Sequence, residues 1–318
     1  MPGWVRWNFN GYEGKEVYSE YSGLMEEVAA LPPGRVMWEA NSDMNRYGTP
    51  MALMLLPYWS DDHPSMEGLY FESSLTTPFH FLNASEVSER PSNPVRGLTY
   101  RRLDMERAVN HLQLYNVGYY VSFTEQGEDE ARSFGLEEVA AAAPWTVFEV
   151  PESSLVDVAT IMPAVWDGDG GFVDTALDWY DDVGNLDSWI VAEGPEEWQR
   201  IDDVDDRFRR PEPTGVTSPR VTNVVLEDHR ISFRTNAVGV PHLVKVSYFP
   251  NWRATGAEGP FRAAPSLMVV VPTERDVVLE FSRSSAERLG ILLTVLGIGA
   301  AVGIPVWRRR RDAELENV

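Results

Sequence analysis

A long uncharged apolar stretch near the C-terminus constrains the fold of this chain more than any other feature. Residues 289–307, LGILLTVLGIGAAVGIPVW, carry no charged side chain, and four arginines follow directly at 308–311. As a helix, these nineteen residues would be about 28 Å long, close to the ~30 Å hydrocarbon core of a bilayer. Lipid offers no partner for open backbone groups, so such a run crosses a membrane as a helix. The sequence therefore predicts a transmembrane helix over 289–307.

The charges beside this stretch predict its orientation. Segments rich in arginine and lysine stay on the cytoplasmic side, and Trp307 suits the membrane interface. We therefore expect a cytoplasmic tail over 308–318, with residues 1 to about 286 on the extracytoplasmic side of the cell membrane. The opposite orientation, with the body in the cytoplasm, would place the four arginines on the wrong side.

A body of this size on the outside needs a segment that directs it across the membrane, and the N-terminal residues show no signal peptide. Residues 1–20 contain no basic n-region, no apolar h-region and no small-residue cleavage site of a signal peptide. The simplest expectation is that the chain is the C-terminal piece of a larger polytopic protein, with the missing N-terminal membrane half as its partner. Residues 1–15 form an aromatic N-terminal tail, which is either the interfacial exit of a preceding span or a frayed terminus.

The charge and the cysteine content exclude several classes of function. The formal net charge is −22, which argues against nucleic acid as a partner, because binding it depends on neutralising phosphates with lysine and arginine. There is no cysteine, so there is neither a disulfide framework nor a cysteine-based metal site. We expect no cofactor and no bound metal, and a body that depends on its own hydrophobic cores.

Hydrophobic periodicity divides the body into two folded parts. In residues 16–162, apolar residues at helical spacing alternate with short apolar strands, which is typical of an α/β layer domain. From residue 221 the period becomes two, which predicts an antiparallel β-sandwich of about six strands over 216–284. Residues 163–215 are acidic and rich in tryptophan, and we interpret them as a connector. The predicted fold class is α+β: an α/β layer domain, a membrane-proximal antiparallel β-sandwich and one C-terminal transmembrane helix.

Local patterns predict the individual elements. Thr49 and Pro50 would begin a helix that halts at Pro57, and 227–229 would be the turn of a hairpin. The remaining expected elements are helices over 16–31, 103–115, 129–134 and 173–183, and strands over 35–39, 117–123, 136–142, 145–150 and 189–192.

The densest polar and aromatic stretch, residues 58–81, is the candidate binding site. It has no clean period, so we interpret it as a long ordered loop with short helical or strand pieces. Its aromatic residues favour a loop packed against the domain, whereas its histidines and carboxylates favour a site that binds a metal or acts on a sugar or phosphate. No H-E-x-x-H spacing is present, so no catalytic or metal-binding residue is assigned. The candidate substrate-binding residues are Trp59, Asp61, His63, Glu67, Glu72 and His80.

Other patterns are weaker signals. The run from Asp167 to Gly171 resembles the start of a calcium loop, but Phe172 stands where such a loop needs glycine, so we interpret it as an acidic turn. Residues 83–85 form a single glycosylation sequon. Structural roles are expected for the other three histidines: His111, His229 and His242.

Several stretches resemble one group of membrane proteins. They are GRVMWE, RYGTPMALMLLPYW, SMEGLYFESSLTTPFHFL, HLQLYNVGYYV and VKVSYFPNWRATGAEGPFRAAPSLMVVVPT. They look like the C-terminal half of large prokaryotic polytopic proteins, the 6-pyruvoyl-tetrahydropterin-synthase-related and YfhO-like group, which resemble GT-C glycosyltransferases. The resemblance covers most of residues 16–307. It implies a polyprenyl-phosphate sugar as donor and a catalytic acidic residue in an early external loop, and no residue of this chain matches that loop.

The resemblance implies a non-catalytic role for this chain. It would be the extracytoplasmic and membrane-anchor portion of a GT-C-like glycosyltransferase that binds or orients a glycan acceptor. The alternative is a single-pass surface module that recognises a glycan or a protein, and a hydrolase using Asp61, His63, Glu67 and His80 ranks third. The expected partners are the lipid bilayer and a glycan or polyprenyl-linked sugar.

Overall fold

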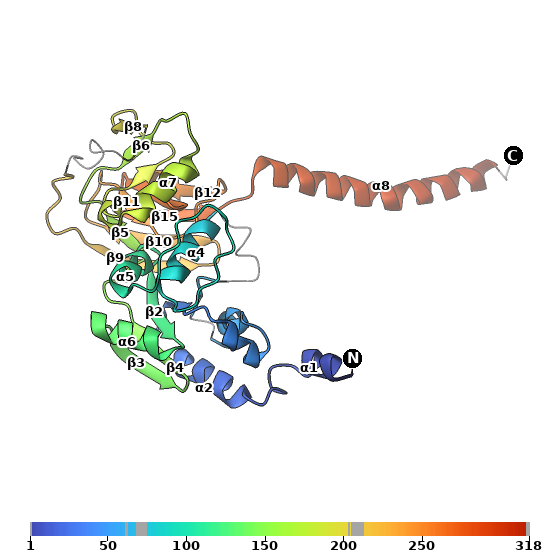
Figure 1. The fold of residues 1–318 in the computed structure, drawn as a ribbon. Coiled ribbons are helices and arrows are strands. Elements are labelled where there is room, and N and C mark those ends of the chain that lie inside the picture. The colour runs from blue at the N-terminus through green and yellow to red at the C-terminus, as the bar shows by residue number, and fades with distance from the viewer. Residues whose placement is uncertain (1, 61–62, 68–74, 203, 205–212, 316–318) are drawn as a thin grey trace.

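The computed structural model describes residues 2–60, 63–67, 75–202, 204 and 213–315 of the chain (Figure 1). In this part, helices and three sheets form a mixed structure, and one apolar C-terminal helix leaves the body. The helices are α1 (Pro2–Phe9), α2 (Tyr18–Ala29), η1 (Ser42–Tyr47), η2 (Ala52–Leu55), α3 (Leu56–Trp59), α4 (Thr77–Glu86), α5 (Met105–Leu114), α6 (Glu125–Phe134), α7 (Phe172–Asp181), η4 (Val183–Asn185) and α8 (Ser285–Leu315).

The N-terminal sheet has four strands in the order β1–β2–β4–β3. β1 runs parallel to β2, whereas the β2–β4 and β4–β3 pairs are antiparallel. A parallel pair needs a long crossover connection, and the segment that contains α4 and α5 provides it. The strands are β1 (Arg35–Trp38), β2 (Val117–Ser122), β3 (Glu137–Ala142) and β4 (Trp145–Glu149).

Both faces of the two central strands, β2 and β4, and of β1 are buried, because residues of each of them enter two different hydrophobic clusters. Val36 and Trp38 pack with residues of α2, η1 and η2 on one face. Met37, between them, packs with residues of α4 and α5 on the other face. The same alternation separates Tyr120 from Val121 in β2. Because both faces are covered, β1 and β2 read as continuous apolar runs instead of alternating ones.

The remaining strands form two sheets that share a core. One sheet has seven strands in the order β5–β11–β14–β13–β7–β6–β8, and the other has four in the order β12–β15–β10–β9. A single cluster holds Val244 and Val270 of the larger sheet together with Ile231 and Leu279 of the smaller. The strands are β5 (Val156–Val158), β6 (Ala164–Trp166), β7 (Ile190–Val191), β8 (Arg200–Ile201), β9 (Val221–Glu227), β10 (Arg230–Thr235), β11 (His242–Val244), β12 (Trp252–Thr255), β13 (Ala257–Ala263), β14 (Leu267–Pro272) and β15 (Asp276–Phe281).

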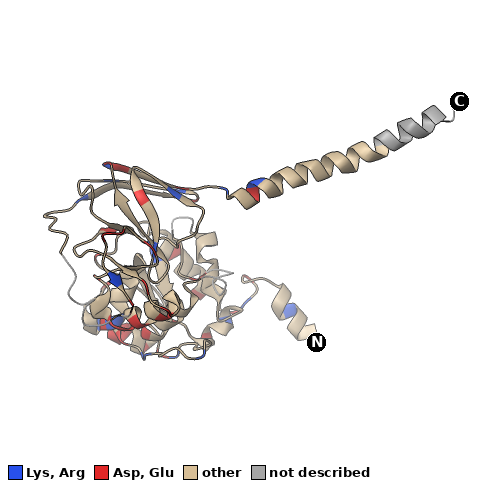
Figure 2. Ribbon diagram, turned by 90° about the horizontal axis from the view of Figure 1, so that it is seen from above, with Lys and Arg blue, Asp and Glu red and all other residues tan. Residues whose placement is uncertain are grey.

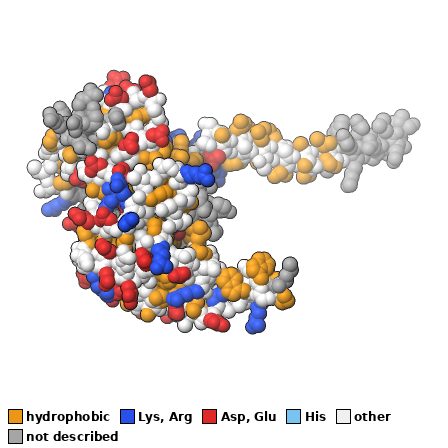
Figure 3. Space-filling view, viewed as in Figure 1, with side chains coloured by type: hydrophobic (Ala, Val, Ile, Leu, Met, Phe, Trp, Pro, Cys, Tyr) orange, Lys and Arg blue, Asp and Glu red, His pale blue; other side chains and the backbone are white. Residues whose placement is uncertain are grey.

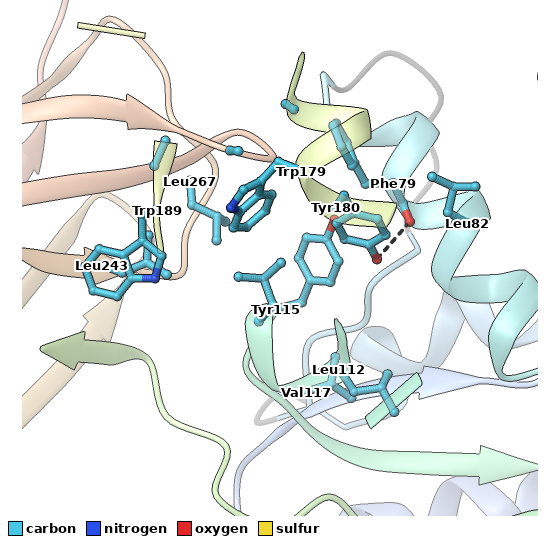
Figure 4. Packing of buried hydrophobic residues seen from close by; sticks show 14 of the residues in the cluster. Phe79, Leu82, Leu112, Tyr115, Val117, Trp179, Tyr180, Trp189, Leu243 and Leu267 are labelled. Carbon is cyan, nitrogen blue, oxygen red and sulfur yellow. Dashed lines mark hydrogen bonds between the residues drawn. The ribbon is translucent and has the colours of Figure 1, made fainter. Parts of the chain in front are cut away.

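Three strands within residues 164–201 take part in this larger sheet, which corrects the interpretation of that stretch as a connector. β6, β7 and β8 extend the seven-stranded sheet, and β5, which lies within 16–162, forms its opposite edge. α7 lies between this sheet and the N-terminal helices, with Trp179 and Tyr180 fully buried (Figure 4). The Tyr180 hydroxyl donates to the carbonyl oxygen of Phe79 at 3.4 Å. Strands of two or three residues are too short to show a period, so the aspartates around them dominated the sequence pattern.

Most of the other expected elements are confirmed, with two differences. The structure contains the predicted helices as α2, α5, α6 and α7, and the predicted hairpins as β3–β4 and β9–β10. Pro57 does not end a helix: it lies in the first turn of α3, where its missing N–H costs nothing. The aromatic N-terminal tail contains the helix α1, in which no residue is buried.

The C-terminal helix α8 begins four residues before the predicted start at 289 and continues directly from the sheet pair. Within the described residues it is the one helix long and apolar enough to cross a membrane: residues 285–305 have a mean hydropathy of 1.8 and are not buried. Ser284 and Glu287 form a capping box: the Ser284 N–H donates to Glu287 Oε2 at 2.6 Å, and the Glu287 N–H donates to Ser284 Oγ at 3.1 Å. Asn251 Nδ2 donates to the same carboxylate oxygen at 2.9 Å, so the helix start is tied to the sheets.

The loop before β12 reaches this junction through a buried aromatic residue. Trp252 is 6% exposed and meets the Phe281 ring edge-on at 5.4 Å, as expected from its position after an apolar strand and a turn. Ser282 donates from its N–H and its hydroxyl to the Asn251 carbonyl oxygen, at 3.0 and 3.1 Å. The last strand, this loop and the start of α8 therefore form one connected unit.

Candidate ligand-binding cleft

His63, the first candidate histidine, has a structural position. It is 1% exposed, and its ring nitrogens contact Ser60 Oγ at 2.5 Å and the Pro32 carbonyl oxygen at 3.0 Å. The carbonyl can only accept, so Nε2 carries the hydrogen and Nδ1 accepts from the hydroxyl. Tyr119 donates to the same Pro32 oxygen at 2.9 Å. Both ring nitrogens are used within the fold, which leaves His63 no nitrogen for a metal or a substrate.

His80 and Glu67, in contrast, form a pair. α4 places the His80 ring so that Nε2 lies 2.8 Å from Glu67 Oε1, with the two side chains 4% and 10% exposed. The His80 ring also lies 5.3 Å from the Phe81 ring, nearly perpendicular to it. Of the six candidate residues, these two are the ones that the described structure brings together.

The other candidates do not join this pair in the described residues. Trp59 ends α3 and is 37% exposed, with its ring edge-on to Tyr58 at 5.0 Å. Asp61 and Glu72 lie outside the residues that the structure describes. Across the described residues, no group of three or more histidine and carboxylate side chains is arranged to hold a metal ion.

Glu67 is also part of the wall of a cleft of about 770 Å³. This volume falls within the usual range for small-molecule sites. The cleft lies between the end of β1, the η1–η2 segment, α4 and the loop 90–95, and most of its wall is apolar. Its lining residues are Trp38, Ala40, Asn41, Ser42, Pro50, Met51, Glu67, Thr77, Phe81, Ala84, Arg90, Pro91, Ser92, Pro94 and Val95.

A fully buried carboxylate holds the walls of the cleft in place. Glu39, one residue after β1, accepts hydrogen bonds from the N–H groups of Phe123 and Thr124 at 2.8 and 2.9 Å, and from the Thr124 hydroxyl at 2.7 Å. It also accepts from the N–H of Glu89 at 3.3 Å, directly before the wall residue Arg90. Three separate segments thus meet at one side chain, so the cleft is preformed.

Two further hydrogen bonds fix the segment that leads into the loop 90–95. The Tyr120 hydroxyl donates to the Val87 carbonyl oxygen at 2.7 Å, and the Ala40 N–H donates to Ser88 Oγ at 2.9 Å. Sequence reasoning did not connect this loop with a site, because residues 84–98 are rich in serine and proline and show no periodicity. The signal that could have pointed to it is the pair Pro91 and Pro94, but prolines stiffen a loop whatever its function.

The polar groups in the cleft are few and differ in character. Glu67 supplies a carboxylate that is shared with His80, and Asn41 an amide whose oxygen accepts from the Asp43 N–H at 2.9 Å. Arg90 lies at the rim with a 65% exposed side chain, 3.3 Å from Glu89 Oε1. The apolar surface comes from residues such as Met51 and Phe81. This set can bind hydroxyl groups on one side of a ligand and an apolar surface on the other.

A second cavity, of about 500 Å³, lies where the N-terminal part meets the larger of the two sheets. Its wall includes Lys245, which is 3% exposed and donates to Asp157 Oδ2 at 2.6 Å and to the Gln113 carbonyl oxygen at 2.7 Å. Burial lowers the pKa of Lys245, and the neighbouring Asp157 partly opposes that shift. Nearby, burial lowers the pKa of Arg35 to about 10. These cations hold backbone oxygens across the seam, which is a structural role.

The weaker sequence signals also have structural outcomes. Asn83 of the sequon is fully buried on α4, so a glycosylating enzyme cannot reach it in the folded protein. The acidic run at 167–171 leads into α7, with Gly171 as the N-cap and Phe172 buried. His242 is buried between Thr235 Oγ1 and the Val240 carbonyl oxygen.

His111 is part of a buried charged cluster. Its Nδ1 lies 2.7 Å from Glu86 Oε2, and its Nε2 lies 3.1 Å from the Tyr180 carbonyl oxygen. Arg107 Nε donates to the other oxygen of Glu86 at 2.5 Å. The Tyr180 ring stacks on the imidazole at 3.7 Å, so the cluster is closed on all these sides.

Comparisons with protein-family models, with curated proteins and with solved structures found no match to this chain.

Proposed function

We propose that this chain is the non-catalytic, extracytoplasmic and membrane-anchor portion of a GT-C-like membrane glycosyltransferase, and that the cleft beside α4 binds or orients a glycan acceptor. In this proposal the N-terminal part is an α/β layer domain, the sheet pair is a membrane-proximal β-sandwich and α8 is the anchor. The observation that carries the proposal is the preformed cleft with its apolar wall and its few polar groups.

The chemistry of the cleft suits a sugar. A sugar ring presents hydroxyls at its edge and C–H groups on its faces, so it needs both hydrogen-bonding groups and an apolar surface. Glu67 would accept from hydroxyls, Arg90 would donate to them, and Phe81 would cover a ring face. Because the polar groups are already held by His80 and Glu89, binding would order few side chains, which favours affinity.

The orientation rests on the arginines after the span. Four arginines at 308–311 favour the cytoplasm for the C-terminus, which puts the cleft outside. Protease added to right-side-out vesicles should therefore digest the body and leave a protected fragment that contains α8. Complete protection of the body would overturn the orientation while leaving the cleft untouched.

Glycan binding is tested with the full chain in nanodiscs. A glycan array, followed by titration calorimetry on the oligosaccharides that bind, should identify ligands of the unaltered protein. Glu67→Gln and Arg90→Gln should each weaken binding at least tenfold, which corresponds to about 1.4 kcal/mol. Matched changes outside the cleft, Glu138→Gln and Arg132→Gln, remove an ion pair between α6 and β3 and should leave affinity unchanged. An array without ligands, or binding that survives both cleft changes, would refute the proposal.

The second candidate is a single-pass surface module that binds a glycan or a protein by itself. It is favoured by one observation: among the described residues, one helix is long and apolar enough to cross a membrane. Purification in mild detergent distinguishes the two. A glycosyltransferase portion should be recovered with, or joined to, a protein with several membrane spans, whereas a surface module should be recovered alone.

A further inference from the structure

Helix α1 exposes large aromatic side chains on a protein that buries most of its others. Trp4 is 69% exposed, Trp7 39% and Phe9 81%, and no residue of α1 is buried. At 3.6 residues per turn, these three and Val5 spread over about 200° of the helix surface, and Arg6 lies in the remaining sector, next to Phe9. Asn8, between them, satisfies its amide by donating to the Trp4 carbonyl oxygen at 2.9 Å. An apolar helix face of this kind needs a partner.

The helix is attached to the body in a defined way. Lys15 Nζ lies 3.9 Å from the centre of the Trp7 ring and donates to Asn10 Oδ1 at 3.2 Å. Tyr12, just after the helix, stacks on the buried Tyr21 at 5.0 Å. These contacts anchor the turn after α1, so its direction is set by the body.

That direction is shared with α8. Figures 1 and 2 show α1 and α8 leaving the body toward the same side, and Figure 3 shows the hydrophobic side chains of both helices projecting there. α8 is the candidate membrane-spanning helix, so α1 extends toward the bilayer that α8 crosses. The apolar surface of α1 therefore lies on the side where α8 would enter the bilayer.

The local charge fits the same partner. The chain carries a net charge of −22, yet its first twelve residues contain Arg6 and no acidic residue; after them, Lys15 stands between Glu13 and Glu16. In Figure 2 the α1 ribbon has a basic position and no acidic one. Tryptophan is favoured at the membrane–water boundary, and basic side chains there extend their charged ends into the headgroup region.

We infer that α1 is a second membrane contact: it lies in the boundary between headgroups and acyl chains, with Trp4 and Phe9 inserted and Arg6 directed to the headgroups. A single span leaves a body free to rotate about the membrane normal and to tilt. A second contact at a distance from the first fixes which face of the body is turned to the membrane. Figure 1 places α4 and the short helices η1 and η2, which line the cleft, on this same side.

The absence of cysteine makes a direct test possible, because one introduced cysteine carries one spin label. The full chain is reconstituted in nanodiscs with a label at Trp4→Cys, Phe9→Cys or Val295→Cys, and collisions with oxygen and with a water-soluble nickel chelate are compared. Val295 lies in the span and serves as the reference inside the bilayer. Phe134→Cys is the matched control, since Phe134 is also exposed, at 42%, but lies on α6 on the opposite side of the body.

At positions 4 and 9 the oxygen-to-nickel ratio should stand severalfold above that at 134 and approach that at 295. A ratio equal to that at 134 would overturn the inference, because it would place α1 in water. Shielding from both reagents would also overturn it, because it would show that α1 packs against protein, such as a second copy. The label at 295 tests the span itself, and none of these results depends on glycan binding.

Discussion

Two histidine–glutamate pairs, each with one member on α4, have nearly the same contact distance but lie in different surroundings. His80, near the start of the helix, contacts Glu67 at 2.8 Å beside the cleft, and Glu86, at its end, contacts His111 at 2.7 Å in the core. Glu86 also accepts from Arg107, and its carboxylate and the imidazole are 1% and 0% exposed. A histidine–carboxylate pair is therefore no sign of a binding site by itself: what distinguishes the first pair is that one member lines an open cavity.

The core pair is joined to further polar and charged groups. The two ring nitrogens of His111 face the Glu86 carboxylate and the Tyr180 carbonyl oxygen. Arg107 joins the same carboxylate to Asp181, whose Oδ1 lies 3.3 Å away. Such a cluster depends on every member being present.

The largest expected effect is on stability. Glu86→Ala removes the carboxylate of the buried His111 and one of the two carboxylates of Arg107, which keeps Asp181, and should lower the free energy of unfolding by about 3–5 kcal/mol. Glu67→Ala removes one partner of His80 at the edge of the cleft, and should cost about 1–3 kcal/mol. Urea unfolding of the full chain in detergent measures both. Equal losses would show that the two pairs have the same structural role.

Stabilisation by a bound ligand should depend on Glu67, which lines the cleft, and not on His111, which does not. A glycan at a hundredfold excess over its dissociation constant should stabilise the unaltered protein by about 2.7 kcal/mol. Glu67→Gln should lose about half of this gain or more, because tenfold weaker binding leaves about 1.4 kcal/mol. His111→Gln should be less stable from the outset yet gain as much on adding ligand. Thermal unfolding with and without the glycan is the measurement. Equal stabilisation of both variants by the glycan would show that Glu67 does not contribute to binding.

The smallest expected effect concerns a histidine without a carboxylate. His242 is buried against Thr235 and the Val240 carbonyl oxygen, and this burial lowers its pKa below the ordinary 6.5. As pH falls below about 6.5, His242 binds a proton in the unfolded chain but stays neutral in the folded chain. Folding stability therefore declines until the pH passes the folded-state pKa.

Comparing the unaltered protein with His242→Gln isolates this contribution from that of the many carboxylates. Between pH 7.5 and 5, the unaltered protein should lose more unfolding free energy than the variant. Parallel pH profiles would mean that His242 titrates alike in the folded and unfolded states.

The sequence predicted those features that depend on nearby residues. The uncharged run before four arginines marked α8. The short helix predicted over 129–134 is the C-terminal part of α6, which ends at Gly135 in the left-handed conformation. The β3–β4 hairpin could be predicted because its two strands are adjacent in the chain. Such features need no knowledge of the rest of the fold.

The cleft could not be predicted, because its walls meet only after folding. Glu39 joins segments fifty and more residues apart, and nothing around Glu89 or Thr124 indicates that their backbones share one carboxylate. The candidate stretch 58–81 contained three wall residues of this site, Glu67, Thr77 and Phe81, and the partner of Glu67, His80. It also contained His63, whose buried position depends on contacts with Pro32 and Tyr119. Residue type alone does not distinguish these two outcomes.

The capping box at the start of α8 connects this helix to the body without a flexible linker. Glu287 is held by Ser284 and by Asn251, and Asn251 is held in turn by Ser282 at the end of β15. A span whose apolar length exceeds the bilayer thickness tilts to keep its side chains in lipid. In the proposed topology, a tilt of α8 would therefore turn the sheets as well and change the height of the cleft above the headgroups. The thickness of the surrounding membrane would then set the height at which the cleft meets a ligand.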